Sequence, residues 1–174
     1  KQNIKFTAKQ WLIVFALGIF GYYISSFLDF EGLQYISAGM ERLILFLYPT
    51  FAVLINAYWF NQKISAAQKW ALAITYSGIA LAYFGELNVY SAGQNFIWGS
   101  FLVFICSITF SIYIVGSGRM IPVLGASKFT AYAMLAATVG VLLHFAIAKN
   151  YEEVAWSKTL AWYAFLLAAI ATVI

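Results

Sequence analysis

The chain has 174 residues, of which 64% are hydrophobic, 20% aromatic and 9% charged. A soluble domain is about 25% charged, so this chain has too few polar side chains to cover a water-exposed surface. Disordered chains are poor in aromatic residues, which excludes that class as well. The composition therefore predicts a protein embedded in a membrane.

The charged residues divide the chain into long uncharged stretches. A bilayer core about 30 Å thick is crossed by a helix of about 20 apolar residues. The apolar runs do not alternate in polarity, as the strands of a membrane barrel would. We therefore expect an all-α integral membrane protein, a polytopic bundle with six helices in this chain. Their predicted limits are 11–30, 43–60, 69–86, 96–116, 127–148 and 159–174.

In the first predicted span, small and polar residues recur at helical spacing, which marks a face that meets other helices or a cavity. These residues are Gly18, Tyr22, Ser25 and Asp29. Asp29 lies at the outer end of this span, and Glu41 lies at the outer end of the second. A carboxylate costs little at such a position, so a structural place at the interface is the plainer interpretation. A role with a proton or a cationic substrate is the alternative.

The second predicted span carries a polar stripe beside a proline. Pro49 removes a backbone hydrogen bond in mid-helix and can kink or break the helix there. Such a break is tolerated where protein or a cavity satisfies the freed carbonyl. We predict that Tyr48, Pro49 and Asn56 bind substrate together with Ser107 and Ser111 of the fourth span. Helix packing alone is the competing interpretation of the same stripes.

Three other features have structural interpretations. Gly116-Ser117-Gly118 is read as the end of the fourth helix. His144 lies about one turn from the outer interface, where a structural histidine is favoured over a proton relay. Cys106 is the single cysteine, so we expect a buried, inert thiol with neither a disulfide nor a thiolate metal site.

The loops on the two sides of the membrane differ in charge. If successive helices cross the membrane in opposite directions, seven of the ten basic residues fall on one side. The other three fall on the opposite side together with all six acidic residues. Cytoplasmic loops carry an excess of Lys and Arg. We therefore expect a multi-pass protein of the plasma (inner) membrane, with the N-terminus of this chain in the cytoplasm.

The stretch from Leu33 to Thr50, LQYISAGMERLILFLYPT, resembles the connection between helices three and four of EamA-type proteins in the drug/metabolite transporter superfamily. A short basic loop follows at 61–65, in which Gln62 stands where the family commonly has Glu, and then a helix rich in small residues. The resemblance implies ten helices in two inverted five-helix halves, of which this chain holds helices three to eight. Residues 1–90 would then be the C-terminal part of the first repeat, and residues 91–174 the N-terminal part of the second. The chain starts without Met and ends inside an apolar run, so we expect a fragment.

This resemblance implies a secondary transporter of small organic metabolites, such as amino-acid-like solutes or drugs. It would act as an exporter, by alternating access without ATP hydrolysis. The expected partners are a small-molecule substrate and the lipid bilayer, with no nucleic acid, no metal and no cofactor, and a homodimer is left open. Two alternatives are an integral membrane enzyme, which usually needs clustered His, Asp or Glu, and a membrane assembly subunit without transport activity.

Overall fold

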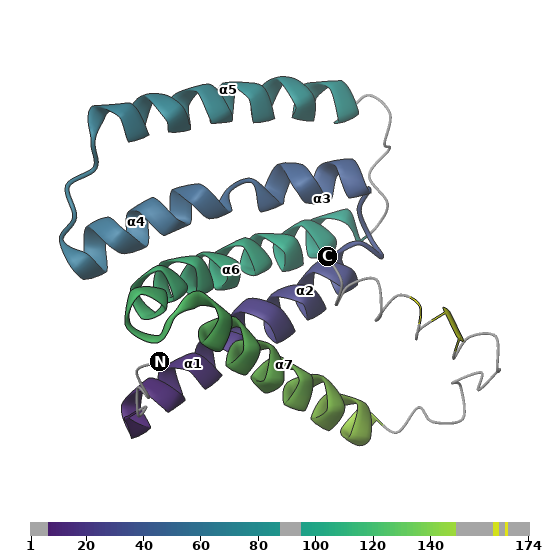
Figure 1. Ribbon diagram of the computed structural model, residues 1–174. Coiled ribbons are helices and arrows are strands. Elements are labelled where there is room, and N and C mark those ends of the chain that lie inside the picture. Colours follow the sequence, from purple (N-terminus) through teal and green to yellow (C-terminus); the bar gives the residue numbers. More distant parts are fainter. Residues whose placement is uncertain (1–6, 88–94, 149–161, 164–165, 167–174) are drawn as a thin grey trace. The chain divides into compact units, whose positions relative to one another are not determined.

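The computed structural model describes residues 7–87 and 95–148, together with Trp162, Tyr163 and Leu166. The chain divides into two compact parts, one ending at Gly140 and the other starting at Val141. All the elements of the described residues are helices, as Figure 1 shows. The predicted all-α class is therefore confirmed.

The first span is one continuous run of helix with a change of type in its middle. It consists of α1 (Ala8–Gly18), the π-helical segment η1 (Ile19–Ile24) and α2 (Ser25–Gly32). Thr7 begins it with a capping box, in which its hydroxyl accepts from the Gln10 N–H and the Gln10 side chain accepts from the Thr7 N–H. The span predicted at 11–30 is confirmed, but its π-helical middle was not predicted.

The second span, from Ala38 to Phe60, is broken in two. Helix α3 (Ala38–Leu45) is capped by the Ser37 hydroxyl, which accepts from the Met40 N–H at 3.1 Å. Helix α4 (Tyr48–Phe60) starts after a two-residue interruption, with Pro49 in its first turn. A proline in that position removes an N–H that would have no partner in the helix. The break predicted from Pro49 is therefore confirmed.

Three further helices follow: α5 (Ala66–Leu87), α6 (Phe96–Leu124) and α7 (Ala126–Ala148). The prediction that Gly116-Ser117-Gly118 ends the fourth helix is wrong, because α6 continues through these residues. Gly116 instead serves packing, since a Cβ at that position would overlap the Leu17 side chain. The helix ends at Leu124 and is followed by Gly125, whose φ of +83° is a conformation that glycine adopts without strain.

The fold is that of a polytopic membrane protein. Among the described residues, four helical spans are long and apolar enough to cross a bilayer: Ala8–Gly32, Ala38–Phe60, Phe96–Leu124 and Ala126–Ile147. Helix α5 has 22 residues and covers the third predicted span, but it is not one of these four. The sixth predicted span, 159–174, lies outside the described residues except for three positions. The inverted repeat and its boundary at 90/91 remain predictions.

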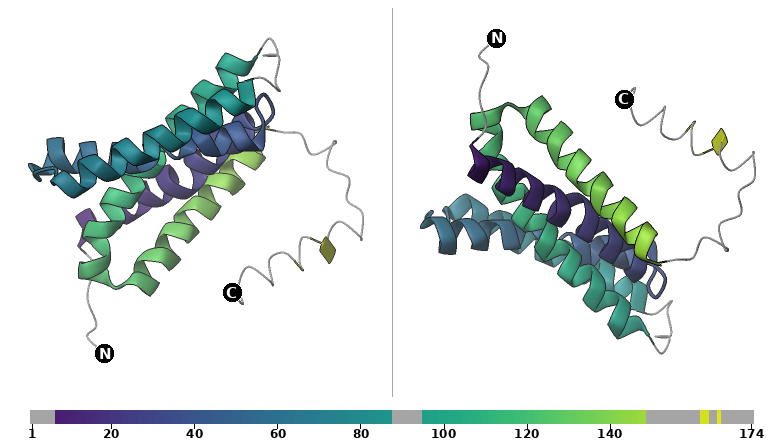
Figure 2. Two further views of the ribbon diagram at one scale, coloured as in Figure 1. Left: turned by 90° about the horizontal axis from the view of Figure 1, so that it is seen from above. Right: turned by 90° about the horizontal axis from the view of Figure 1, so that it is seen from below.

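Helix α6 is the centre of the part that ends at Gly140. It packs against the first span, α3 and α4, as Figures 1 and 2 show. The first span in turn packs closely on the N-terminal part of α7, where a Cβ at Gly18 would overlap the Ala133 backbone. The core formed there contains Val14, Leu17, Tyr113, Leu124, Phe129 and Ala133. Helix α5 packs on α3 and α4, away from α6 (Figure 1).

Candidate functional site

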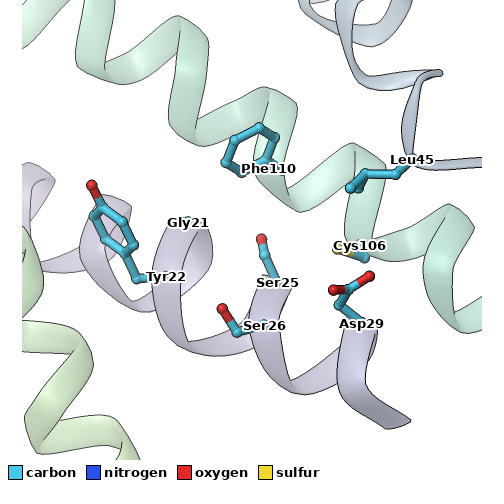
Figure 3. A pocket seen from close by; sticks show the side chains of 8 residues that line it. All are labelled: Gly21, Tyr22, Ser25, Ser26, Asp29, Leu45, Cys106 and Phe110. Carbon is cyan, nitrogen blue, oxygen red and sulfur yellow. The ribbon is translucent and has the colours of Figure 1, made fainter. Parts of the chain in front are cut away.

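A cavity of about 190 Å³ lies between the first span, α3 and α6. Figure 3 shows its lining side chains, most of which come from one face of the first span. Leu45 comes from the end of α3, and Cys106 and Phe110 come from α6. The lining residues are Gly21, Tyr22, Ser25, Ser26, Asp29, Leu45, Cys106 and Phe110. The cavity is therefore built between helices that are far apart in the sequence.

The π-helical segment shapes this cavity. A π turn inserts an extra residue into a helix, and such turns are frequent at functional sites. The Ser25 hydroxyl donates to the Phe20 carbonyl at 2.7 Å and lies 2.9 Å from the Thr109 hydroxyl of α6. Gly21 lies directly against the Tyr113 ring, where a Cβ would overlap ring atoms. A larger residue at position 21 would force the first span away from α6.

Polar side chains of the first span meet polar partners at three levels along the cavity. The Tyr22 and Tyr113 hydroxyl groups are 2.8 Å apart, and one turn further along Ser25 pairs with Thr109. At the third level the carboxyl groups of Asp29 and Glu41 are in hydrogen-bond contact. The cavity thus changes from a phenolic end to an acidic end.

The acidic end is largely enclosed. The Glu41 side chain is 7% exposed, and the Arg42 guanidinium acts on it electrostatically. Asp29 lines the cavity, and its Oδ1 atom is buried without a hydrogen-bond partner. A buried carboxylate oxygen without a partner is costly, so a group that donates hydrogen bonds would be stabilised there.

Four of the five predicted substrate-binding residues lie together behind one wall of the cavity, and none of these four lines it. The Ser111 hydroxyl lies 2.8 Å from the Tyr48 carbonyl oxygen and 2.6 Å from that of Ser107, so it links α6 to α4. Both serines are 0% exposed. The Tyr48 ring meets the Phe110 ring edge-on at 5.2 Å, and Phe110 lines the cavity. Pro49 follows Tyr48 in the first turn of α4.

Asn56, the remaining predicted residue, lies two turns further along α4 in a different pocket. Its amide nitrogen donates to the Ala52 carbonyl at 3.0 Å. The pocket has a volume of about 100 Å³ and is lined by Ala52, Val53, Asn56, Gln62, Lys63, Ile64 and Gln68. The structure therefore does not bring Asn56 together with the Tyr48 group.

The prediction of the site missed the cavity itself, although part of its lining had a signal. Tyr22, Ser25 and Asp29 belong to the inward stripe read from the sequence of the first span. Cys106 and Phe110 had no such signal, because they are apolar neighbours of the serines that were singled out in the fourth span. In the described part of the chain, no group of three or more His, Cys, Asp or Glu side chains is placed to hold a metal ion.

The comparisons with known proteins agree with the resemblance seen in the sequence. Residues 1–84 match the EamA-like transporter family. An uncharacterized transporter of Bacillus subtilis, YcbK, is 31% identical over 127 residues, which are 73% of this chain and 40% of that protein. An uncharacterized transporter of Archaeoglobus fulgidus is 26% identical over 129 residues, 72% of this chain and 43% of that protein. No solved structure matches.

These matches place the chain in a class of multi-pass membrane proteins. The match over residues 1–84, together with the relatives named as transporters, supports an EamA-like family member and confirms the resemblance. The chain spans about two fifths of the length of the curated relatives that it matches.

Proposed function

We propose that the complete protein is a secondary transporter that exports small organic metabolites, such as amino-acid-like solutes or drugs, across the plasma membrane. The observation that carries this proposal is the partly polar cavity between the membrane spans of an EamA-like chain. Small-molecule sites are concave and mostly apolar, with a few polar groups that fix orientation. The lining of this cavity has that character.

The depth of the cavity supports transport by alternating access. The first span covers Ala8–Gly32, and Tyr22 and Ser25 lie close to its middle. Transporters built from inverted repeats hold substrate near the bilayer midplane, at the interface between the repeats. Six of the lining residues belong to the proposed first repeat, residues 1–90, and Cys106 and Phe110 belong to the proposed second. Rocking of these repeats against each other would open the cavity to either side in turn.

The five residues predicted from the sequence take two places in this mechanism. Tyr48, Pro49, Ser107 and Ser111 form the wall behind Phe110, beside the interruption between α3 and α4, and they support the cavity without lining it. Asn56 forms a second contact along the path, in the pocket next to Lys63. The loops at 61–65 and at Gly125 face the cytoplasm in this proposal.

An export assay with the complete gene tests the function. Cells that express the protein are loaded with pools of metabolites, and the medium is compared with that of cells carrying an empty vector. Accumulation of a solute in the medium, abolished by Ser26→Phe, supports export through the cavity, because Ser26 lines it. Leu54→Phe, on the exposed face of α4, is the matched control. If no solute differs between the two cultures, the proposed function is wrong.

A further inference from the structure

The acidic end of the cavity holds a carboxylate that is incompletely satisfied. Two carboxyl groups in hydrogen-bond contact share a proton, so Asp29 and Glu41 together carry a single negative charge, and Arg42 acts on Glu41. Asp29 keeps one buried oxygen without a partner, and this residue lines the cavity (Figure 3). Buried carboxylates are normally paired with a positive group or with several hydrogen-bond donors. An occupant of the cavity can supply both.

The rest of the lining limits what this occupant is. None of the eight described residues that line the cavity is Lys, Arg or His, so an anionic group would have no partner there and would face two carboxyl groups. Phe110 and Tyr22 offer aromatic surfaces and Leu45 an aliphatic one. A cation gains stability beside an aromatic face, and an apolar chain gains it by leaving water.

Inorganic cations fit this lining less well. Hard metal ions require several oxygen ligands in a closed shell. In the described part of the chain, no group of three metal-ligating side chains is present. An ammonium group has three donors of its own and needs only a carboxylate and one or two further acceptors.

We propose that the cavity binds small organic amines, with the protonated amino group on Asp29 and the apolar part of the molecule against Phe110 and Leu45. This proposal rests on the proposed function, because it names the class of solute that the transporter carries. It makes Asp29 a specificity-determining residue, and it gives Glu41 the role of positioning the Asp29 carboxylate through their hydrogen bond.

A binding experiment with the purified complete protein tests this. The probes are phenethylamine and phenethyl alcohol, which share a ring and a chain but differ in charge. We expect phenethylamine to raise the midpoint of thermal unfolding. Phenethyl alcohol at equal concentration should leave this midpoint unchanged. Equal effects of the two probes, or no effect of either, would overturn the proposal.

A pair of variants assigns the effect to one carboxylate. Asp29→Asn should weaken phenethylamine binding by at least about tenfold, which corresponds to about 1.4 kcal/mol, because the variant replaces a charge-assisted hydrogen bond with a neutral one. Glu31→Gln is the control, because it makes the same chemical change two residues away, at a side chain that bonds to Gln34 instead of lining the cavity. Undiminished binding by a folded Asp29→Asn variant would overturn the assignment. If that variant does not fold, the comparison of the two probes on the unmodified protein still decides.

Two further measurements separate this inference from the proposed function. If sodium chloride alone protects the protein in the same way, and Asp29→Asn abolishes the protection, the site belongs to an inorganic cation and the proposal is wrong. If phenethylamine binds but proteoliposomes do not move it or any other solute, the amine site stands and the transport function fails. If other solutes are transported and the amine does not bind, only the present inference fails.

Discussion

The hydroxyl groups of Tyr22 and Tyr113 lie 2.8 Å apart, and their rings are 5.0 Å apart between centroids. This contact joins the π-helical segment of the first span to α6, from positions 91 residues apart in the sequence. It also fixes the Tyr22 ring, which lines one end of the cavity. The interhelical hydrogen bond and the shape of the cavity therefore depend on the same pair.

Tyr113→Phe removes this hydrogen bond and keeps the ring. Interhelical hydrogen bonds in membrane proteins contribute about 0.6 to 1.7 kcal/mol, so we expect a loss of stability in that range. Thermal unfolding of the purified complete protein measures it. Tyr58→Phe is the control, because it makes the same chemical change at a side chain that is 88% exposed. Equal midpoints for the two variants would show that the Tyr22–Tyr113 bond contributes nothing.

Gly18 and Gly78 provide a matched pair for testing helix packing. A Cβ at Gly18 would overlap the Ala133 backbone, which cannot move aside as a side chain can, whereas a Cβ at Gly78 would meet nothing within 4 Å. Gly18→Ala should therefore lower stability by more than about 1 kcal/mol, the usual cost of forced overpacking. Gly78→Ala should be neutral or slightly stabilising, because alanine has a higher helix propensity than glycine. Size-exclusion profiles after graded heating distinguish the two, and a stable Gly18→Ala variant would contradict the close approach of α1 and α7.

The proposed orientation predicts the result of reporter fusions. The Arg119 guanidinium lies 3.2 Å from the centre of the Phe60 ring, so the ends of α4 and α6 are at the same side of the bundle. Fusions near Ala66 and Leu124 should therefore both report the cytoplasm. Fusions after Val89 and near Glu152, positions outside the described residues, should report the exterior. A cytoplasmic signal after Val89 would contradict the six-span arrangement and the inverted repeat inferred from it.

The helical spans could be predicted because membrane helices need long apolar runs, which are visible in one sequence. The interruption before Pro49 could also be predicted, because proline acts on its own helix. The π-helical segment could not, because the residues packed against it, such as Thr109 and Tyr113 of α6, are distant in sequence. Gly116 was misread for the same reason, since its contact with Leu17 is distant in sequence.

The candidate site shows the same limit. Helical spacing correctly grouped Tyr22, Ser25 and Asp29 on one face, but it could not show that the cavity opens there. The spacing also suggested that Asn56 and Ser111 would act together. In the structure the Ser111 hydroxyl bonds to the Tyr48 carbonyl, and Asn56 lies in a separate pocket. Residues on one face of a helix can lie several turns apart and belong to different sites. Periodicity alone therefore does not show at which depth in the membrane each residue lies.

Asn56→Leu tests whether that second pocket belongs to the transport path. The Asn56 amide nitrogen donates one hydrogen bond to the Ala52 carbonyl, so a second N–H and the amide oxygen can serve a solute beside Gln62 and Lys63. Leucine has a similar size but neither donates nor accepts. We expect transport by the complete protein to fall about tenfold or more, which corresponds to the loss of about 1.4 kcal/mol of polar interaction. Membrane levels, measured by immunoblot, should stay near normal, as they should for the control Leu54→Ala on the exposed side of α4.

Normal transport by Asn56→Leu would show that this residue does not belong to the transport path. Failure of the variant to accumulate, with Leu54→Ala unaffected, would assign Asn56 to the packing of α4 instead.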